Sequence, residues 1–512
     1  MIWTVGAIEM DRPLAVPRNT FRMRLRRHIL IGVGLLALVT AIGSLPVAFV
    51  YFMSGPVEQS PLTVNEEILP EAMNDEELPS DNSPRAINAI QTKPQPVVAF
   101  VNVNVVPMDT ERVIANQTVI VQDGRIAEIG PAAKVKIPES ALRVDGSGKY
   151  LMPGLADMHV HLTATREDVL ALLQLFVANG VTTILNLRGT PEHLELRAAV
   201  EKGEVFGPTI YTAGSYVNQP FVNTPDEVER AVVEQKRAGY DFIKMHGDLS
   251  REAYARLFAV ARREGIRVVG HAPRNLGLEA MFEERQYAVV HAEEYIYDRN
   301  SSSRDFAAIE PRIPELGQAT AKAGIWLMPN LTAYKNIGLQ LNDLQKILDR
   351  PEMRFMPPDI RQGWGPATNP YTRRFKKEQY PGIMARYALL EKLVKGFRAA
   401  GVRILIGTDA LNTAVVPGFS AHDELNDLVA AGLTPYEALR AATANAAEFL
   451  GTADRTGTVT VGKRADLILV EGDPLKDVAN ANRRAGVMLR GRWLAEADLR
   501  KMLDDLVASY SR

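Results

Sequence analysis

The 512-residue chain contains no cysteine. Disulfides, thiolate metal sites, a cysteine nucleophile and a lipidated N-terminal cysteine are therefore excluded. An excess of either charge is also missing, because 59 Lys and Arg residues oppose 61 Asp and Glu residues. A net charge of −2 gives no general attraction to nucleic acid. The 46% hydrophobic and 23% charged residues are typical of a globular enzyme and exclude a wholly disordered, collagen-like or coiled-coil chain.

A long apolar run near the N-terminus departs from this ordinary composition. Residues 29–53 contain no Asp, Glu, Lys or Arg. A helix of that length spans about 37 Å, enough to cross the hydrocarbon core of a membrane. Arginines crowd the tail at 1–28, which predicts that this tail stays in the cytoplasm (Arg18, Arg22, Arg24, Arg26 and Arg27). We expect a single-pass anchor with the rest of the chain on the periplasmic or extracellular side. Cleavage as a signal peptide, followed by secretion, stays open as the alternative.

The composition changes again at residue 54. Residues 54–95 are rich in Pro, Ser, Asn and acidic side chains and are expected to form a disordered linker. Short strand patterns follow at 97–106, 117–121 and 125–129, with a hairpin turn at Asp123-Gly124. Similar patterns return at 457–470 and 486–493. We therefore expect 96–150 and 456–496 to pair into one small β-sandwich domain.

The segment between these two β pieces, residues 151–455, alternates short apolar strands with helical patterns. The expected strands are 156–161, 182–187, 209–213, 242–245, 267–271, 288–291, 325–328 and 403–408. This alternation predicts an α/β fold, a (β/α)8 TIM barrel inserted in the small β domain. The last gap is long enough for an insertion at about 341–381, and its role as a lid, a structural segment or a contact with a second copy stays open. Residues 497–512 are expected to form an amphipathic helix without chemistry.

Five of the expected strands end in ionisable residues. His159 and His161 lie two apart on the first strand, so both side chains point to one face. The other four residues follow four later apolar strands (Lys244, His271, His291 and Asp409). Such strand ends form the active-site mouth of a barrel. A buried Lys or Asp without a partner is costly, and a metal cluster would explain why these residues are there.

The motifs around these residues resemble the amidohydrolase superfamily, in its prolidase- and imidazolonepropionase-like branch. The resemblance covers roughly residues 96–496 and is strongest in LMPGLADMHVHL, FIKMHG, VVGHA, VVHAEEY and ILIGTDA. It implies two divalent metal ions as cofactors. His159, His161 and Asp409 would bind the first metal, and His271 and His291 the second. Lys244, carboxylated by CO2, would bridge both.

The residue chemistry agrees with this implication. Imidazole and carboxylate ligands without thiolate favour Zn²⁺, with Mn²⁺, Co²⁺ and Fe²⁺ also compatible. Two metals would lower the pKa of a bridging water, and the resulting hydroxide would attack a carbonyl carbon. Asp409 would act as the general base and then as the general acid. The predicted function is hydrolysis of an amide C–N bond in a small molecule or short peptide, of dipeptide, Xaa-Pro or N-acyl amino acid type.

Three other functions stay open. A lactone or ester hydrolase would use the same binuclear site. A mononuclear-metal deaminase is disfavoured, because deaminase-like relatives carry a Glu three residues after the strand-end histidine, whereas this chain has Arg274 there. A non-catalytic, membrane-tethered scaffold is disfavoured because no ligand residue has been lost.

The remaining polar residues give weaker expectations. His246, Arg188 and Tyr334 are candidate substrate contacts, with a structural role as the alternative for each. Glu293-Glu294, after His291, is a candidate for orienting the ligands, but it is left out of the site because acidic pairs are usually solvated. His422 is expected to support the site or a helix end, and His193 and His28 to be solvated or at an interface. Homo-oligomer formation is a further possibility that the sequence leaves open.

Overall fold

The computed structural model of this protein describes residues 97–297 and 306–511. The expected anchor at 29–53, the linker at 54–95 and His28 lie outside these ranges. Within them, no helix is both long enough and apolar enough to span a membrane.

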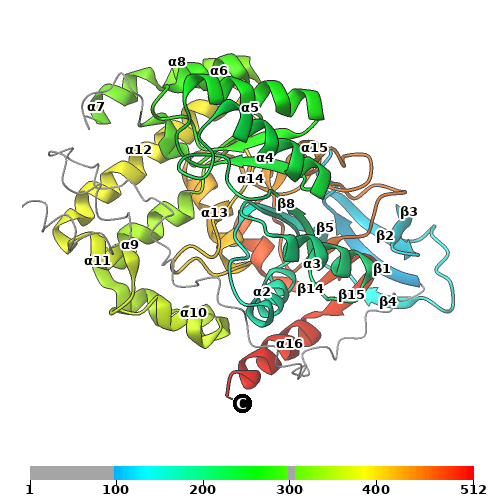
Figure 1. The fold of residues 1–512 in the computed structure, drawn as a ribbon. Coiled ribbons are helices and arrows are strands. Elements are labelled where there is room, and N and C mark those ends of the chain that lie inside the picture. The colour runs from blue at the N-terminus through cyan, green and yellow to red at the C-terminus, as the bar shows by residue number, and fades with distance from the viewer. Residues whose placement is uncertain (1–96, 298–305, 512) are drawn as a thin grey trace, which may run out of the picture. The chain divides into compact units, whose positions relative to one another are not determined.

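The first and last strands of the described chain form one sheet, as the sequence predicts for the two β pieces (Figure 1). Its strands run in the order β15 (Arg492–Ala495), β14 (Arg484–Leu489), β13 (Leu467–Val470), β5 (Tyr150–Pro153), β1 (Val97–Val105), β2 (Ile114–Gln122) and β3 (Arg125–Pro131). The Asp123-Gly124 hairpin is confirmed, since both residues have positive φ and β2 pairs antiparallel with β3. Phe100 of β1 meets Trp493 of β15 edge-to-face at 5.0 Å, which joins the two pieces in one core.

The expected β-sandwich is wrong in one respect: the described strands are hydrogen-bonded into a single branched sheet. One edge of β1 pairs with β4 (Leu142–Asp145) through its first half and with β5 through its second half. The sheet also curls, because Ile126 donates its N–H to the Lys463 carbonyl at 2.9 Å. One continuous sheet therefore wraps the core that two separate layers were expected to enclose.

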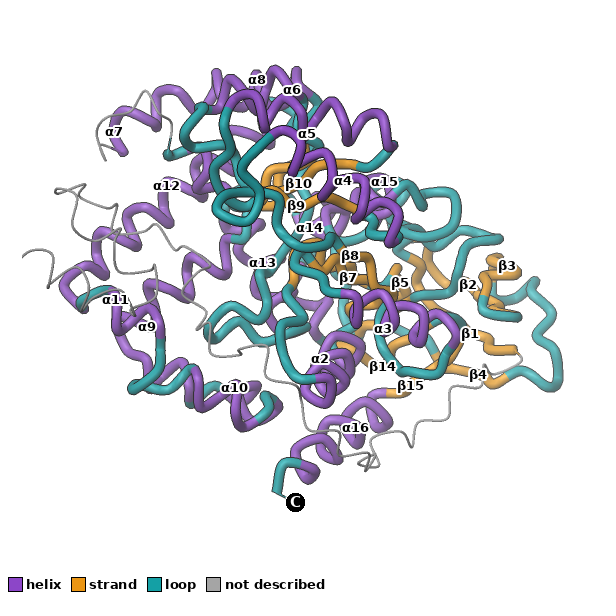
Figure 2. Tube along the Cα trace, viewed as in Figure 1, coloured by secondary structure: helices purple, strands orange, loops and turns teal. Residues whose placement is uncertain are grey.

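The middle of the chain has the predicted mixed α/β pattern. Seven expected strands are present, all in parallel pairings: β6 (Leu155–Val160), β7 (Val181–Asn186) and β8 (Thr209–Thr212) in one sheet, and β9 (Phe242–Met245), β10 (Arg267–Gly270), β11 (Ala288–Val290) and β12 (Trp326–Met328) in another. The helices between them are α2 (Arg166–Ala178), α3 (Pro191–Lys202), α4 (Pro225–Ala238), α5 (Arg251–Glu264), α6 (Leu278–Glu284) and α8 (Ile313–Ala323). Figure 2 shows these helices outside the strands.

The eighth expected strand, 403–408, is an extended segment held by isolated parallel bridges instead of a full strand. One bridge joins Leu327 to Ile404 and another joins Val160 to Ala410. A third, between Ala213 and Phe242, connects the two parallel sheets. Asp409, whose φ is 60°, interrupts the regular strand geometry just before the bridge at Ala410. Apolar side chains from all eight segments meet in one cluster, which includes Met158, Leu185, Ala213, Phe242, Val269, Val290, Met328 and Leu405.

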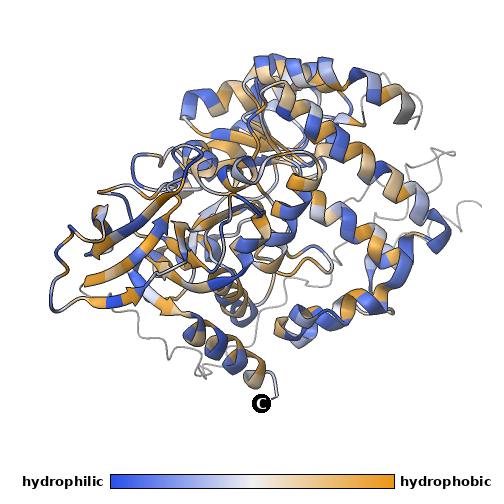
Figure 3. Ribbon diagram, turned by 180° about the vertical axis from the view of Figure 1, so that it is seen from behind, coloured by the Kyte–Doolittle hydropathy of each residue, from blue (hydrophilic) through white to orange (hydrophobic). Residues whose placement is uncertain are grey.

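The predicted insertion is helical and packed. The predicted range 341–381 begins inside α9 (Leu331–Leu348), contains α10 (Pro358–Gly363) and α11 (Pro370–Arg374), and ends in the first turn of α12 (Tyr380–Ala399), which returns to the strands. Its Met353, Phe355 and Trp364 are buried in a cluster with side chains of α2 and with Leu506. Leu506 belongs to α16 (Glu496–Ser509), the expected C-terminal amphipathic helix. Figure 3 shows hydrophobic and hydrophilic residues alternating along α16.

Three further helices follow the eighth segment and precede β13. They are α13 (Phe419–Ala430), α14 (Pro435–Ala441) and α15 (Ala444–Leu450). Phe449 of α15 stacks on Phe242 of β9 at 5.3 Å, so α15 packs against the apolar cluster between the strands.

Candidate active site

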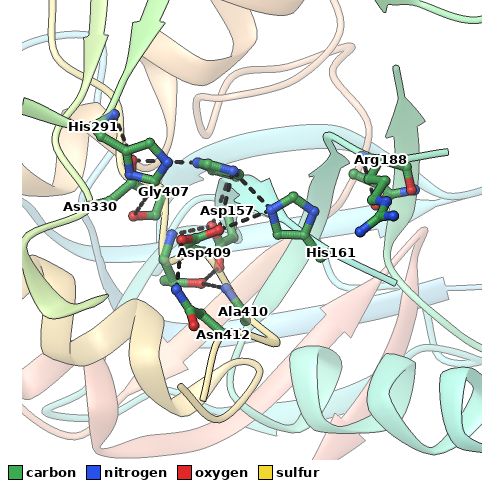
Figure 4. Close-up of polar contacts among 12 residues, drawn as sticks. Asp157, His161, Arg188, His291, Asn330, Gly407, Asp409, Ala410 and Asn412 are labelled. Atoms are coloured by element: carbon green, nitrogen blue, oxygen red, sulfur yellow. Dashed lines mark hydrogen bonds and ion pairs between the residues drawn. The ribbon is translucent and has the colours of Figure 1, made fainter. Parts of the chain in front are cut away.

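The structure brings the first three predicted ligands together. The Nε2 atoms of His159 and His161 lie 3.3 and 3.0 Å from Oδ1 of Asp409, and 3.2 Å from each other. His159 and His161 flank Val160, the last residue of β6, and Val160 pairs in parallel with Ala410, the residue after Asp409, so the pairing itself places the three side by side. Figure 4 shows His161 beside Asp409. These three buried groups form a candidate metal site.

The other predicted ligands continue this cluster. The His291 ring centroid lies 5.0 Å from that of His159 and 4.9 Å from that of His271. Lys244 is fully buried on β9, opposite Val269 of β10. Gly270, the residue before His271, pairs with Met245, the residue after Lys244, so Lys244 and His271 lie at the same end of two neighbouring parallel strands. All six predicted residues therefore lie around one region at the carboxyl ends of the strands.

Burial sets the protonation states of these groups. It lowers the pKa of His159 far below its usual value and that of His271 to about 3, so both imidazoles are neutral at pH 7. Burial alone would raise the pKa of Asp409, but its interactions with His159 and His161 lower it. Neutral imidazoles and an ionised carboxylate are the forms that bind a metal.

Asn330, which the sequence analysis missed, contacts three parts of this site. Its Nδ2 donates to the Gly407 carbonyl at 2.7 Å, which turns Oδ1 toward the backbone N–H of His291 at 3.1 Å and Nδ1 of His159 at 3.4 Å. With Nδ1 of His159 facing an acceptor, Nε2 is left to face Asp409. Asn330 follows β12 by two residues, so the same strand-end pattern could have identified it, but a neutral amide did not stand out.

Leaving Glu293 and Glu294 out of the site was wrong. Both are buried, and Glu294 Oε1 lies 2.9 Å from Nδ1 of His271. Arg274 donates to both oxygens of Glu294, at 2.6 and 3.2 Å. Burial would raise the pKa of Glu294, but the Arg274 charge and the His271 hydrogen bond keep it below its ordinary value. Glu294 therefore orients His271, and Arg274, at the position of the deaminase glutamate, holds Glu294.

The candidate substrate contacts fall into two groups. Half-buried His246 lies 4.5 Å from the His271 ring and stacks on Tyr216, also at 4.5 Å. Exposed Arg188 lies over the other end of this row, 5.3 Å from the Tyr216 ring. Figure 4 places Arg188 apart from Asp409, beyond His161. Tyr334 is buried 6.1 Å from the His291 ring, and its hydroxyl is hydrogen-bonded to Glu293.

The backbone at the site is unusual. His291, Asn330 and Asp409 all have positive φ, a conformation that non-glycine residues adopt rarely and that is often found at functional sites. Gly407 lies against His159, and a Cβ at this position would come within 2.7 Å of the His159 Cβ. A glycine is therefore needed where the eighth segment passes the first ligand.

The two other described histidines have structural roles. His422 Nε2 lies 2.9 Å from the Asn179 carbonyl and 3.1 Å from Nη1 of Arg484, so it supports helix α2. The expectation that His193 is solvated is wrong: it is buried, accepts from the Thr190 N–H at 2.9 Å and lies 3.0 Å from the Leu162 carbonyl. Its position at the start of α3 explains its burial, because it caps that helix.

The donor set fits divalent metal ions. Imidazole nitrogens and one carboxylate oxygen converge within hydrogen-bonding distance, without thiolates. This combination suits Zn²⁺ and related ions. A fully buried lysine, on the strand next to that of His271, adds a group that becomes an anionic oxygen ligand on carboxylation.

Comparison with known proteins places this site in a family. The enamidase of Eubacterium barkeri is 24% identical over 375 residues, which cover 72% of this chain and 84% of that protein. Two solved structures share the fold: bottromycin amidohydrolase, with a TM-score of 0.65, 24% identity and coverage of 84% of this chain and 94% of that one, and a Xaa-Pro dipeptidase with bound methionine, with a TM-score of 0.59, 19% identity and coverage of 78% and 100%. The amidohydrolase family pattern matches residues 150–494, about two thirds of the sequence. The chain belongs to the amidohydrolase family.

Proposed function

We propose that this member of the amidohydrolase family, a hydrolase of carbon–nitrogen bonds, cleaves the amide bond of a dipeptide, Xaa-Pro or N-acyl amino acid substrate with two divalent metal ions. The observation that carries the proposal is the convergence of His159, His161 and Asp409, with neutral imidazoles and an ionised carboxylate. The relatives named above as an amidohydrolase and a Xaa-Pro dipeptidase support an amide or dipeptide substrate.

The chain's residues divide into two ligand groups. His159, His161 and Asp409 would hold one ion, and His271 and His291 the other. Lys244, carboxylated by CO2, would bridge them, which gives a fully buried amine an anionic role. When bound, two such ions, of which Zn²⁺ fits the ligands best, lower the pKa of a water molecule and polarise the substrate carbonyl.

Asp409 would carry the proton. Its carboxylate accepts a proton from the attacking water and returns it to the leaving amine nitrogen, as general base and then general acid. The row of Tyr216, His246 and Arg188 runs outward from His271 and offers aromatic faces and a cation for a substrate side chain or carboxylate. Tyr334 offers a second polar contact near His291.

We also propose a closed (β/α)8 barrel and an N-terminal membrane anchor. Support for the barrel comes from parallel pairings that pass from β8 to β9, from β12 to the 403–410 segment and from that segment back to β6. Support for the anchor comes from the apolar run at 29–53 and the arginines before it.

A hydrolysis screen tests the activity. The full chain, loaded with Zn²⁺ or Mn²⁺, is incubated with dipeptides, N-acyl amino acids and lactones, and free amine and acid are quantified. We expect metal-dependent release of an amine from at least one amide class. Turnover of lactones alone would favour the ester hydrolase. Failure with every class and every metal would contradict catalysis.

Lys244→Ala tests the bridging ligand. We expect most activity to be lost and metal content to fall, because both ions lose a shared anion, and short carboxylates should partly restore activity. The matched control is Lys236→Ala, since Lys236 is exposed on α4 and contacts only a backbone carbonyl among the described residues. If Lys244→Ala kept full activity and two bound metal ions, the proposed bridging role of Lys244 would be wrong.

A further inference from the structure

We propose that the helical insertion completes the active site, because its Tyr371 positions Asp409 through Asn412. The inference rests on the proposed function in one respect, that Asp409 is the proton carrier. It concerns a different part of the chain, since Tyr371 lies on α11, inside the segment that follows α9.

The first step of the connection is between the insertion and the loop after the eighth segment. The Tyr371 hydroxyl donates to Oδ1 of Asn412 at 2.5 Å, and the backbone N–H of Thr413 donates to the same oxygen at 2.8 Å. With two donors on Oδ1, the orientation of the Asn412 amide is settled, because the NH2 group must point the other way.

The second step reaches the catalytic carboxylate. Asn412 Nδ2 donates to Oδ2 of Asp409 at 3.1 Å, while Oδ1 of Asp409 faces His159 and His161 (Figure 4). The two oxygens of Asp409 are therefore distinguished: one faces the ligands and the other is held by an amide. Asn412 therefore prevents free rotation of the Asp409 carboxylate, and the orientation of Asn412 is itself set by Tyr371 and the Thr413 N–H.

Tyr371 is itself held firmly. It is 4% exposed, and its backbone N–H donates to Oδ1 of Asn369 at 3.0 Å, at the start of α11. Asn369 donates to Oε1 of Gln340 on α9 at 2.8 Å, and Gln340 donates to the Thr413 carbonyl at 3.2 Å. Tyr371 of the insertion and Gln340 of α9 thus contact the 411–413 loop at two points, and Asn369 joins the two, so the phenol is set in place before a substrate arrives. Tyr371 and Asn412 are positioning residues, since neither touches the reacting atoms.

A double-mutant cycle tests this chain of contacts in the full-length, metal-loaded protein. Tyr371→Phe removes only the hydroxyl, and we expect kcat to fall about 5-fold or more, the effect of one hydrogen bond, with KM nearly unchanged. Asn412→Ala should lower kcat further. The Tyr371→Phe change should have little additional effect in the Asn412→Ala background, because its contact is then already lost.

The control is Tyr380→Phe, a half-buried tyrosine at the start of α12 that has no described contact with Asn412. It should leave kcat unchanged. Fully additive losses from Tyr371→Phe and Asn412→Ala, or an unchanged kcat in Tyr371→Phe, would overturn the proposal. If the wild-type protein hydrolyses nothing in the screen, the same cycle is measured by the thermal shift on adding Zn²⁺. Non-additive thermal shifts would support the connection from Tyr371 to Asp409 even though the proposed function had failed. Additive thermal shifts would reject the connection as well as the proposed function.

Discussion

At the scale of residues, the candidate site depends on side chains that contact the ligands as much as on the ligands themselves. His159 and His271 each place Nδ1 against an acceptor, Asn330 in one case and Glu294 in the other. Each acceptor is held in turn, Asn330 by the Gly407 carbonyl and Glu294 by Arg274. Such partners set the imidazole tautomer and leave the other nitrogen for a metal.

Replacing Asn330 with Ala should weaken metal binding. The His159 ring loses its acceptor, and the His291 N–H loses one of its two, so we expect metal affinity to fall about 10-fold or more. The measurement is a competition titration with a chromogenic chelator. Asn480→Ala on the surface of the β domain is the control. Wild-type affinity in Asn330→Ala would show that His159 is oriented without this amide.

Glu294→Gln removes the negative charge beside His271 and keeps the size and shape of the side chain. The amide keeps one acceptor for Nδ1 but loses the negative charge that Arg274 and His271 share, so metal affinity should fall and folding should survive. Glu294→Ala should also lower the thermal midpoint, because Arg274 is left without its main partner. Metal content and melting temperature are measured for both variants. Equal metal affinity in wild type and Glu294→Gln would contradict a role for this charge.

At the scale of elements, the 403–410 segment matters more than its short pairing suggests. It carries Asp409, it pairs with β12 on one side and β6 on the other, and its Gly407 lies against His159. The last expected strand therefore appears as a set of single bridges that place a ligand. The insertion makes a similar contribution from outside, through Tyr371.

Gly407→Ala should disturb the first metal site with little effect on the rest of the fold. An added methyl would come within 2.7 Å of the His159 Cβ and 3.1 Å of Asn330 Nδ2, so either His159 or the segment must shift. We expect reduced metal content and reduced kcat, with circular dichroism unchanged. Gly363→Ala is the control, because a Cβ there meets no atom within 4 Å. Normal metal content in Gly407→Ala would show that the segment can adjust.

His422, which links α13 to α2 and β14, should make stability depend on pH. Burial, helped by the Arg484 charge, lowers its pKa from 6.5 to about 3. The unfolded chain therefore binds a proton in this interval that the folded chain does not, and the free energy of unfolding falls as pH is lowered from about 6.5 toward 3, by at most about 1.4 kcal/mol per pH unit. His422→Gln removes this group and should flatten the curve of melting temperature against pH. Parallel curves of melting temperature against pH for the wild type and His422→Gln would contradict this role of His422.

At the scale of the whole molecule, the sequence predicts a membrane anchor at 29–53 and a linker at 54–95, both outside the described residues. A hydrolase carried on such a tether would meet its substrates on the periplasmic or extracellular side.

Truncation tests this arrangement. The full chain should fractionate with membranes, and a chain beginning at Pro96 should be recovered in the soluble fraction with the same kcat and metal content. Intact full-length protein in the soluble fraction would contradict the anchor. Release with a new N-terminus near residues 43–55 would instead support signal-peptide cleavage. N-terminal sequencing of each fraction distinguishes the two.

The six candidate ligands could be selected from the sequence, because an apolar strand that ends in one ionisable residue is a local pattern in the chain. This pattern is found at His159, Lys244, His271 and Asp409, and parallel strands bring their ends to one edge of the sheet. The residues that hold these candidate ligands in place show no such pattern. Asn330 is a neutral amide, Glu294 is part of an acidic pair like those on many surfaces, and Tyr371 lies 41 residues before Asn412. Their roles come from contacts between distant segments in a buried, low-dielectric site, and only the folded chain decides which of them meet.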